Sequence, residues 1–281
     1  MLFYEDTTAD FKIHMSNYSS WPKPVASHIH TYYELYFLLD GSIKYFIGDS
    51  FYFLKSNDIV LIPPNIFHRT RPDATEKHSR ILLNFAPSFI KKLFNDEDGS
   101  TDIFNKVCLF HPNQQEQNVI RYIAGKMLEK YKESPTIYPS FLSSHLSVLL
   151  YTLKECISSS DPLIPQNNDV PETLCSIIHY INSSYFNEIT LSTLSQKFYL
   201  HPTYISNLIK KELGMTFTEY LTRIRIVKSL QLLQGNKHKI EEIASICGFN
   251  SSSRYSKVFS SYFKMSPLKY KKEVLNDPNK Q

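Results

Sequence analysis

The chain has 281 residues with a formal net charge of +4, and 42% of its residues are hydrophobic. This length allows two domains, each with a hydrophobic core of its own. No basic segment followed by an apolar stretch occurs in residues 1–20, which argues against a signal peptide. Four cysteines have neither the spacing of a zinc site nor that of a disulfide framework, and reduced thiols in a cytoplasmic protein are expected at Cys108, Cys156, Cys175 and Cys247.

Short aromatic and aliphatic runs fill the N-terminal third of the chain. Turn signals such as Asp40-Gly41 and Pro63-Pro64 separate these runs. Runs of this length at this spacing predict the strands of a β-barrel or sandwich. The expected strands are ELYFLL (34–39), IKYFIG (43–48), FYFL (51–54), DIVLIPP (58–64) and RILLNF (80–85).

Three histidines and one glutamate in this region follow a regular spacing. His28 and His30 are two residues apart, so on a strand they face the same side. With Glu34, Gly41 and His68 they form an HxHx3Ex6G…PxNxxH pattern, which resembles the cupin superfamily of small jelly-roll barrels. In metal-binding cupins, the matching histidines and glutamate hold a metal ion. The second half departs from the cupin pattern, where Asn57 and Asn65 replace the usual glycines and Pro72 replaces the usual asparagine.

The sequence leaves three interpretations of these side chains open. They line a pocket for a small polar molecule, they are hydrogen-bonded core residues, or they hold a metal ion. We favour the pocket, because aromatic faces with a few polar groups suit a carbohydrate; an apolar ligand remains an alternative. No resident metal or cofactor is predicted, although His28, His30, Glu34 and His68 are the candidate ligands if there is one. The predicted effector-binding residues are His28, His30, Glu34, Tyr36 and His68.

Two amphipathic helical patterns follow the strands. The first is an apolar stripe of Val119, Ile120, Ile123, Met127, Leu128 and Tyr131, and the second a stripe of Leu142, Leu146, Leu149, Leu150, Leu153 and Ile157. The second helix lies in the uncharged run 134–153, whose prolines and serines favour a loop and a buried helix over a membrane span. Such a leucine-rich helix needs either the outer wall of the barrel or a second copy of the chain as a partner, and we favour a two-fold dimer. A polar segment with prolines then predicts a linker over 161–171.

One motif occurs twice in the last third of the chain. The first copy is LSTLSQKFYLHPTYISNLIKKELGMTFTEY (191–220), and the second is IEEIASICGFNSSSRYSKVFSSYFKMSPLKY (240–270). Each copy predicts a short helix, a tight turn and an amphipathic second helix, which is a helix-turn-helix unit. A single copy would fit an ordinary helical hairpin, but the repeated apolar register argues against that. Two such units in tandem can enter two neighbouring stretches of the major groove.

Local signals and charge agree with this interpretation. Thr190 is a suitable N-cap for the first unit, Gly248 ends the first helix of the second unit, and a serine among 251–253 can cap the next helix. From Val170 onward there are 15 Lys and Arg against 8 Asp and Glu, which gives +7. The preceding residues have 16 against 19, which gives −3, and the two sum to the +4 of the whole chain. A basic C-terminal module is expected if that module binds a polyanion.

Three stretches of this region resemble the AraC/XylS family of bacterial transcription regulators, namely YLTRIRIVKSLQLL (220–233), IEEIASICGF (240–249) and SPLKYKK (266–272). Ser195 and Ser229 stand where the family usually has alanine, and Lys264 stands where it usually has glycine. If that position keeps a positive φ, Lys264 costs about 1 kcal/mol, while it also adds a charge toward phosphate. The resemblance implies that the second helix of each unit enters the major groove. Carried over by position, the DNA-binding residues are Thr203, Ser206, Asn207, Lys210, Ser252, Ser253, Arg254, Lys257 and Lys264.

The expected fold is an α+β multidomain chain with a cupin-like β-barrel, or jelly roll, followed by an all-α tandem helix-turn-helix domain. The expected domains are an effector-binding barrel (1–110), a helical dimerisation region (111–160), a linker (161–171) and the DNA-binding domain (172–275). The expected function is ligand-responsive transcription regulation without catalysis. The expected partners are double-stranded DNA, a small-molecule effector, a second copy of the chain and, for an activator, RNA polymerase, with no membrane. The alternatives are a metal-dependent cupin enzyme fused to a DNA-binding tail and a regulator without a ligand.

Overall fold

The computed structural model describes residues 11–18, 27–72, 77–94, 102–134, 139–159 and 170–275. The chain divides into two compact units, the first ending at Gln166 and the second continuing from Asn167. Most of the expected linker, and most of residues 1–20, where no signal peptide is expected, lie outside the described residues. Within the described residues, no helix has both the length and the apolar character needed to cross a bilayer.

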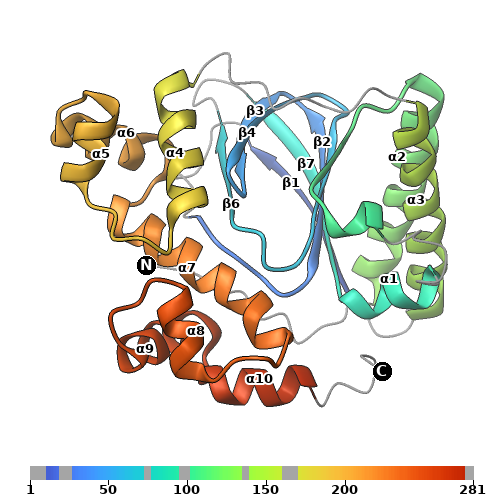
Figure 1. The fold of residues 1–281 in the computed structure, drawn as a ribbon. Coiled ribbons are helices and arrows are strands. Elements are labelled where there is room, and N and C mark those ends of the chain that lie inside the picture. The colour runs from blue at the N-terminus through green and yellow to red at the C-terminus, as the bar shows by residue number, and fades with distance from the viewer. Residues whose placement is uncertain are drawn as a thin grey trace. The chain divides into compact units, whose positions relative to one another are not determined.

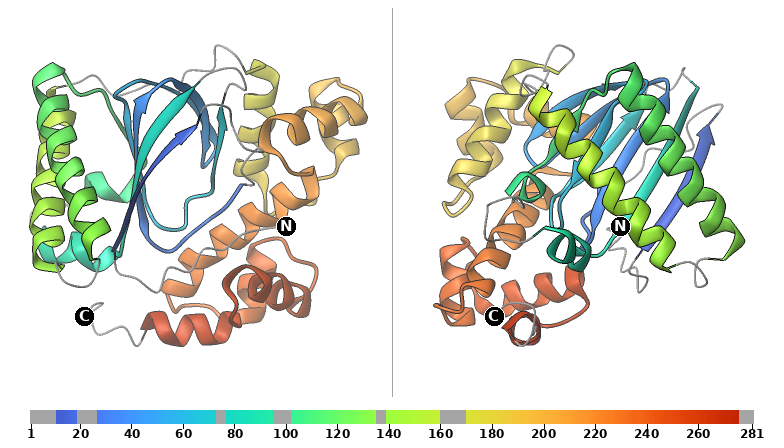
Figure 2. Two further views of the ribbon diagram at one scale, coloured as in Figure 1. Left: turned by 180° about the vertical axis from the view of Figure 1, so that it is seen from behind. Right: turned by 90° about the vertical axis from the view of Figure 1, so that its right-hand side faces the viewer.

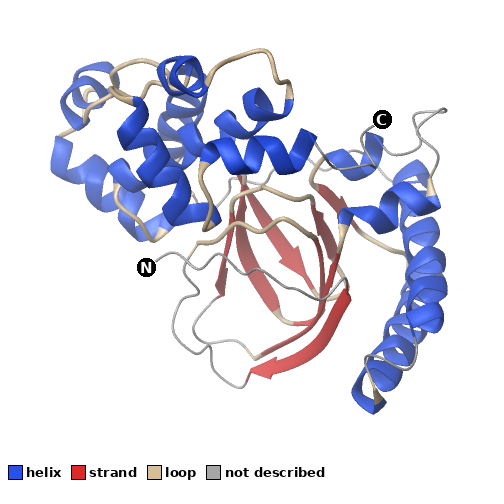
Figure 3. Ribbon diagram, turned by 90° about the horizontal axis from the view of Figure 1, so that it is seen from below, coloured by secondary structure: helices blue, strands red, loops and turns tan. Residues whose placement is uncertain are grey.

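Two antiparallel sheets form the framework of the first unit (Figures 1 and 3). The five-stranded sheet has the order β1-β7-β2-β5-β8, and the three-stranded sheet has the order β4-β3-β6. All five expected strands are confirmed, as β2, β3, β4, β5 and β7, and the sequence pattern does not predict β1, β6 or β8. The strands are β1 Phe11–Tyr18, β2 Tyr33–Asp40, β3 Ser42–Ile47, β4 Ser50–Lys55, β5 Ile59–Ile62, β6 His68–Pro72, β7 His78–Phe85 and β8 Cys108–Phe110.

The central strand β2 is buried on both faces, because side chains alternate across a strand. Leu35 and Phe37 point outward into the hydrophobic core that the sheet shares with the helices. Tyr36 and Leu38 point inward, where they join a second cluster contributed by both sheets. That inner cluster consists of Tyr36, Leu38, Ile43, Tyr45, Ile47, Leu54, Val60 and Ile62.

Helices cover the outer face of the five-stranded sheet, and Figure 2 shows α2 and α3 side by side on it. They are α1 Pro87–Leu93, α2 Gln114–Glu133 and α3 Pro139–Ser159, with a 3-10 turn at Asp102–Asn105. The described leucines of the second stripe are at most 4% exposed and belong to the same core as the sheet. The leucine stripe therefore packs on the sheet of its own chain, and the inference of a dimer from this stripe was wrong. Val119 is 43% exposed, so it does not belong to the buried stripe of α2.

The second unit consists of helices throughout its described length. They are α4 Glu172–Ser184, α5 Leu191–Phe198, α6 Pro202–Leu213, α7 Phe217–Gln234, α8 Ile240–Ile246, α9 Ser252–Phe263 and α10 Pro267–Leu275. Helices α5 and α6 form the first helix-turn-helix and α8 and α9 form the second, as the repeat predicts. Thr190 caps α5 through a reciprocal bond with Thr193, which confirms the expected start of that helix.

A close junction joins the two helix-turn-helix units. Arg225 of α7 donates from Nε to the carbonyl oxygen of Tyr185 and from Nη2 to that of Asn187, both at 2.8 Å. Gly248 follows α8, the first helix of the second helix-turn-helix, and has φ +78°. A Cβ at this position would lie 2.8 Å from the carbonyl oxygen of Phe186. The segment after α4 is thus held by both α7 and the α8–α9 turn. This junction fixes the second helix-turn-helix against the first.

We expect Gly248→Ala to lower the free energy of unfolding of the second unit by about 2 kcal/mol or more. The new side chain meets backbone, and an L-residue is disfavoured in this left-handed conformation. Thermal and denaturant unfolding of the full-length chain measure the change.

Gly125→Ala is the matched control. Its Cβ meets open space within α2, so a gain of about 1 kcal/mol is expected from helix propensity. Equal unfolding midpoints for Gly248→Ala and the wild type would contradict the described junction.

Candidate functional site

The expected DNA-binding residues lie on the outward faces of α6 and α9. Their inward faces are anchored by fully buried residues such as Ile205 and Ile209 in α6 and Tyr255 and Phe259 in α9. Ser206 and Ser252 are half-buried, and the other members of the set are exposed, namely Thr203, Asn207, Lys210, Ser253, Arg254, Lys257 and Lys264. The structure therefore presents two short polar surfaces, one on each second helix, of the kind that contacts bases and phosphates.

The caps of these helices determine which side chains remain available. Ser251 caps α9 by accepting from the backbone N–H of Arg254 at 3.2 Å, which leaves Ser252 and Ser253 out of the capping role. His201 caps α6 by accepting from the backbone N–H of Thr203 at 3.3 Å. The structure also explains Ser229, one of the residues that depart from the family pattern. The buried hydroxyl of Ser229 accepts a hydrogen bond from Tyr255 at 3.1 Å, which ties α7 to α9.

Two residues occupy left-handed backbone that usually favours glycine. Lys264, at the end of α9, has φ 56°, and its Nζ donates to the carbonyl oxygen of Ser261 at 3.2 Å. Tyr199, in the turn between α5 and α6, also has φ 56° and is 93% exposed. Tyr199 is not among the predicted DNA-binding residues, although the offset of the repeat aligns it with Gly248 and so marks the position. A large exposed aromatic in strained backbone beside α6 is a candidate contact residue.

The histidines and glutamate of the first unit meet in a buried cluster. One Glu34 carboxylate oxygen lies 3.4 Å from His30 Nε2, and the other lies 3.7 Å from His68 Nε2. His28 faces His68, with ring centroids 4.2 Å apart, and the two residues exchange backbone hydrogen bonds of 3.1 Å. One donor atom from each of the four residues lies within 4.8 Å of the others. The four predicted residues are therefore brought together, in the burial and proximity that a metal ion requires.

Backbone carbonyls orient two of the imidazole rings. His30 Nδ1 lies 2.8 Å from the carbonyl oxygen of Tyr32, and His68 Nδ1 lies 2.9 Å from that of Ile66. A carbonyl only accepts, so each Nδ1 carries the proton. In the neutral rings, Nε2 then presents a lone pair toward the Glu34 carboxylate. Two lone pairs and a carboxylate in one buried space repel one another unless protons or a cation lie between them.

Glu34 is held as a carboxylate by its neighbours. Burial alone would raise the pKa of Glu34, but the positive charge of His68 and His30 in their protonated form, and hydrogen bonds from both, hold that pKa well below its ordinary value. The carboxylate therefore requires positive charge beside it, either from protons on Nε2 of the two rings or from a cation. Tyr45 donates its hydroxyl to Glu34 Oε1 at 2.8 Å. Burial and Glu34 itself raise the pKa of Tyr45 well above its ordinary value, so this donor stays protonated. The cluster is thus centred on the Glu34 carboxylate, with the Tyr45 hydroxyl and the two imidazole rings beside it.

Tyr36 lies beside this cluster and outside its set of donors. It is fully buried, its ring is 5.3 Å from that of Tyr45, and the Arg80 guanidinium lies 5.1 Å from its centroid. Burial raises the pKa of Tyr36 to about 12. The inward-facing side chains around it are aliphatic and aromatic and pack as one cluster, so Tyr36 is buried within the core that both sheets share.

Two asparagines account for the departure from the cupin pattern. Asn57 has φ 77° and Asn65 has φ 63°, so both keep the left-handed backbone for which cupins use glycine. Asparagine tolerates this conformation better than other side chains. The side chain of Asn57 also accepts from Arg121 of α2 at 3.2 Å, which fixes the turn to the helical layer. Pro72, the third departure, has no described side chain.

The architecture is that of a transcription regulator with a sensor domain and a tandem helix-turn-helix domain. Comparison with protein families agrees: an AraC-like ligand binding domain matches residues 20–150, and a helix-turn-helix domain matches residues 194–273. The chain belongs to the AraC family of transcription regulators. Its N-terminal unit is a ligand-binding domain, and its C-terminal unit binds DNA.

Relatives support this assignment along most of the chain. The Msm operon regulatory protein of Streptococcus mutans is 25% identical over 258 residues, which cover 87% of this chain and 86% of the relative. The transcriptional regulatory protein HptR of Staphylococcus aureus is 34% identical over 123 residues, or 44% of this chain and 48% of HptR. The chain thus spans about half the length of HptR. Among solved structures, ToxT of Vibrio cholerae matches 95% of this chain and 99% of its own at 19% identity, but with a TM-score of only 0.39.

We expect Lys264→Gly to raise the free energy of unfolding by about 1 kcal/mol, because glycine adopts φ 56° without the steric cost of a Cβ. If Lys264 also contacts phosphate, the same variant weakens DNA binding about equally for all sequences and lowers the salt slope by about one. Denaturant unfolding and DNA titrations at several salt concentrations separate the two effects. An unchanged unfolding midpoint would show that Lys264 is not strained.

Proposed function

We propose that the chain is a cytoplasmic transcription regulator without catalytic activity, whose first unit senses a divalent transition-metal ion. The observation that carries this proposal is the buried cluster of His28, His30, Glu34 and His68, with four donor atoms within 4.8 Å. Imidazole nitrogens combined with one carboxylate suit ions such as Zn²⁺, Ni²⁺, Fe²⁺ and Mn²⁺. A cation relieves the repulsion between the lone pairs and the carboxylate that face one another here.

The surroundings of the cluster match those of built metal sites. Metal-binding histidines usually donate their second N–H to a carbonyl or carboxylate, and His30 and His68 both do so. The Glu34 carboxylate is likewise held, by the hydroxyl of Tyr45. The expected carbohydrate effector stays an alternative, and a ligand-free core network is a second one. Full burial of His30, His68 and Tyr36 favours an ion over a sugar, because a sugar needs a larger open volume.

The residues of the cluster come from both sheets and from the segment before β2, so a bound ion can affect how these three parts are arranged. Glu34 belongs to the five-stranded sheet through β2, whereas His68 belongs to the three-stranded sheet through β6. His28 and His30 come from the segment before β2. A bound ion therefore joins both sheets and that segment, and its binding free energy stabilises one arrangement of them. We propose that this change is transmitted to the DNA-binding unit.

The burial of the donors also argues for sensing rather than for metal-dependent catalysis, which requires a position open to substrate.

A second copy of the chain is proposed as a partner through a different surface from the leucine stripe. On the described faces of α2 and α3 that point away from the sheet, Tyr122 is 66% exposed and Val148 is 53% exposed, and Val119 is also exposed. Exposed apolar side chains grouped on a helical pair are typical of a dimer contact. RNA polymerase is a further partner if the chain activates transcription.

The metal proposal predicts that the purified full-length protein retains about one divalent transition-metal ion per chain, and that Glu34→Gln and His68→Ala lose it. Elemental analysis by mass spectrometry measures the content. Added Zn²⁺, Ni²⁺ or Mn²⁺ should also raise the unfolding temperature of the wild type but not that of these two variants, because an ion that binds the folded state stabilises it.

His179→Ala is the control for this measurement, because His179 is an exposed histidine of α4 outside the cluster. It should retain the ion. Absence of retained metal, together with an unfolding temperature that none of these ions changes, would leave the carbohydrate or ligand-free interpretation.

For the DNA-binding surfaces, Asn207→Ala and Lys257→Ala should each weaken specific binding by about 1–3 kcal/mol if they contact bases. Competition titrations with specific and unrelated duplexes give the loss of discrimination. Lys12→Ala, at an exposed position of β1, is the control and should bind as the wild type does. Wild-type affinity for both α6 and α9 variants would mean that other residues read the sequence.

The dimer proposal predicts that Tyr122→Glu shifts the sedimentation of the full-length chain from dimer to monomer, because a charge replaces an apolar contact. Tyr122 is exposed, so the unfolding midpoint of the monomer should not fall. A wild-type chain that sediments as a monomer at micromolar concentration would refute the proposal.

A further inference from the structure

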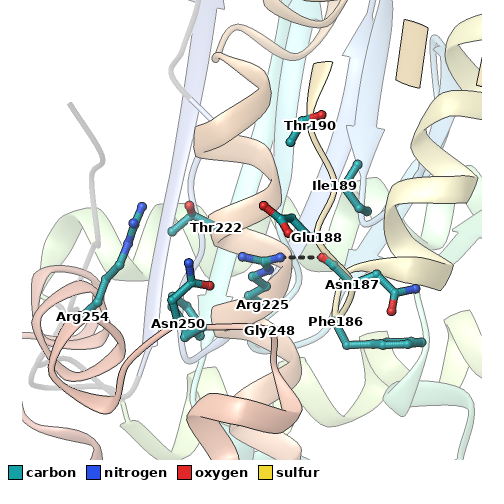
Figure 4. A pocket seen from close by; sticks show the side chains of 11 residues that line it. Phe186, Asn187, Glu188, Ile189, Thr190, Thr222, Arg225, Gly248, Asn250 and Arg254 are labelled. Atoms are coloured by element: carbon teal, nitrogen blue, oxygen red, sulfur yellow. Dashed lines mark hydrogen bonds between the residues drawn. The ribbon is translucent and has the colours of Figure 1, made fainter. Parts of the chain in front are cut away.

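A cavity of about 390 Å³ lies within the second unit, at the junction of its two helix-turn-helix motifs. It is lined by residues from the segment after α4, from α7, and from the turn and first residues of α9 (Figure 4). The polar lining includes Asn187, Thr190, Thr222, Arg225, Asn250 and Arg254. The cavity is thus built from both motifs and from the helix that joins them.

Two guanidinium groups give the cavity its charge. Arg225 is oriented by its hydrogen bonds to the Tyr185 and Asn187 carbonyls, which use two of its five N–H donors and leave three. Arg254 projects from the exposed side of α9 (Figure 4). Burial and then the nearby charge of Arg254 lower the pKa of Arg225. Among the residues that the structure describes, neither guanidinium forms an ion pair with a carboxylate. Two guanidinium groups that line one cavity favour an anion as its ligand.

The place of the cavity identifies the anion as a DNA phosphate. A duplex that enters both motifs places its backbone across the junction between two successive stretches of major groove. Arginine, threonine and asparagine side chains are typical phosphate contacts, and they fix register without reading sequence. Arg254 belongs to the same helix as Lys257, so the cavity adjoins the surface that faces DNA.

We propose that Arg254 and Arg225 bind one backbone phosphate of the operator between the two major-groove contacts, with Thr222 and Asn250 as supporting donors. This assigns Arg254 to positioning the duplex, whereas its place on α9 predicts a contact with a base. The proposal rests on DNA binding by the tandem helix-turn-helix unit and is independent of the metal proposal.

Glu188 also lines the cavity, and its carboxylate is exposed. Its charge opposes that of the arginines and weakens the attraction for a phosphate. The two kinds of charge therefore predict opposite effects. Removal of the positive charge at Arg254 lowers the affinity for DNA, and removal of the negative charge at Glu188 raises it.

The test uses the full-length chain and a duplex that the wild type selects from random-sequence DNA. Each phosphate is replaced in turn by an uncharged methylphosphonate, and affinity is measured for the wild type, Arg254→Gln and Glu188→Gln. The wild type should lose ~10-fold in affinity when one phosphate between the two major-groove contacts is neutral, as expected for a charged hydrogen bond. Arg254→Gln should bind the unmodified duplex ~10-fold more weakly and lose less than the wild type does at that phosphate, because only Arg225 still contacts it. Its salt slope should fall by about one, with base preference unchanged.

Glu188→Gln should bind more tightly and keep the sensitivity to that phosphate. The proposal is overturned if Arg254→Gln keeps the wild-type sensitivity at every phosphate, or if it changes the base preference at one position with an unchanged salt slope. In both cases the assignment of the chain as a sequence-specific regulator is unaffected, because the wild type still selects its duplex. A wild type that selects no sequence would remove the proposal together with sequence-specific binding. Arg254 is exposed, so equal unfolding midpoints confirm that the variant is folded.

Discussion

The DNA-binding unit depends on the junction that fixes its two helix-turn-helix motifs relative to each other. Arg225 holds the backbone after α4, Gly248 allows that backbone to approach the α8–α9 turn, and the buried pair of Ser229 and Tyr255 joins α7 to α9. Each second helix presents only a few small or basic side chains, so neither has the contacts for high specificity alone. A fixed spacing lets the two sets of contacts act on one duplex, and affinity then gains from both without a further entropic cost.

The first unit is organised by the buried carboxylate of Glu34. Burial of a charge is unfavourable unless partners surround it, and here histidines from two further segments and the hydroxyl of Tyr45 do so. Because these partners come from both sheets, the cluster links the two sheets through polar contacts. The leucine-rich helices complete the same unit from outside, where they share a core with the five-stranded sheet. The five-stranded sheet therefore lies between two hydrophobic clusters, one shared with the helices and one shared with the three-stranded sheet.

Features with a local pattern could be predicted from the sequence, and features that depend on distant pairing could not. The repeat, the caps and the cupin-like spacing each lie within a few tens of residues, and they indicated the DNA-binding unit and the Glu34 cluster. Strand β1 pairs with β7, which follows five other strands along the chain, and the mixed polar pattern of β1 does not mark it as a strand. The leucine stripe of α3 is compatible with packing on the sheet and with a dimer interface, and the sequence alone does not distinguish the two. Arg225 has the sequence context of a surface arginine on a joining helix, and only the fold shows that it binds backbone carbonyls.

The most direct test of this account is the selection of duplexes from random-sequence DNA by the full-length protein at physiological salt. The account predicts a motif of two elements whose centres lie about one helical turn, 10–10.5 bp, apart, with a fixed spacing, because the junction holds α6 and α9 in one arrangement. Selection of a single short element, or of two elements with freely variable spacing, would contradict the fixed junction. Salt-sensitive capture without any motif would contradict sequence-specific regulation itself.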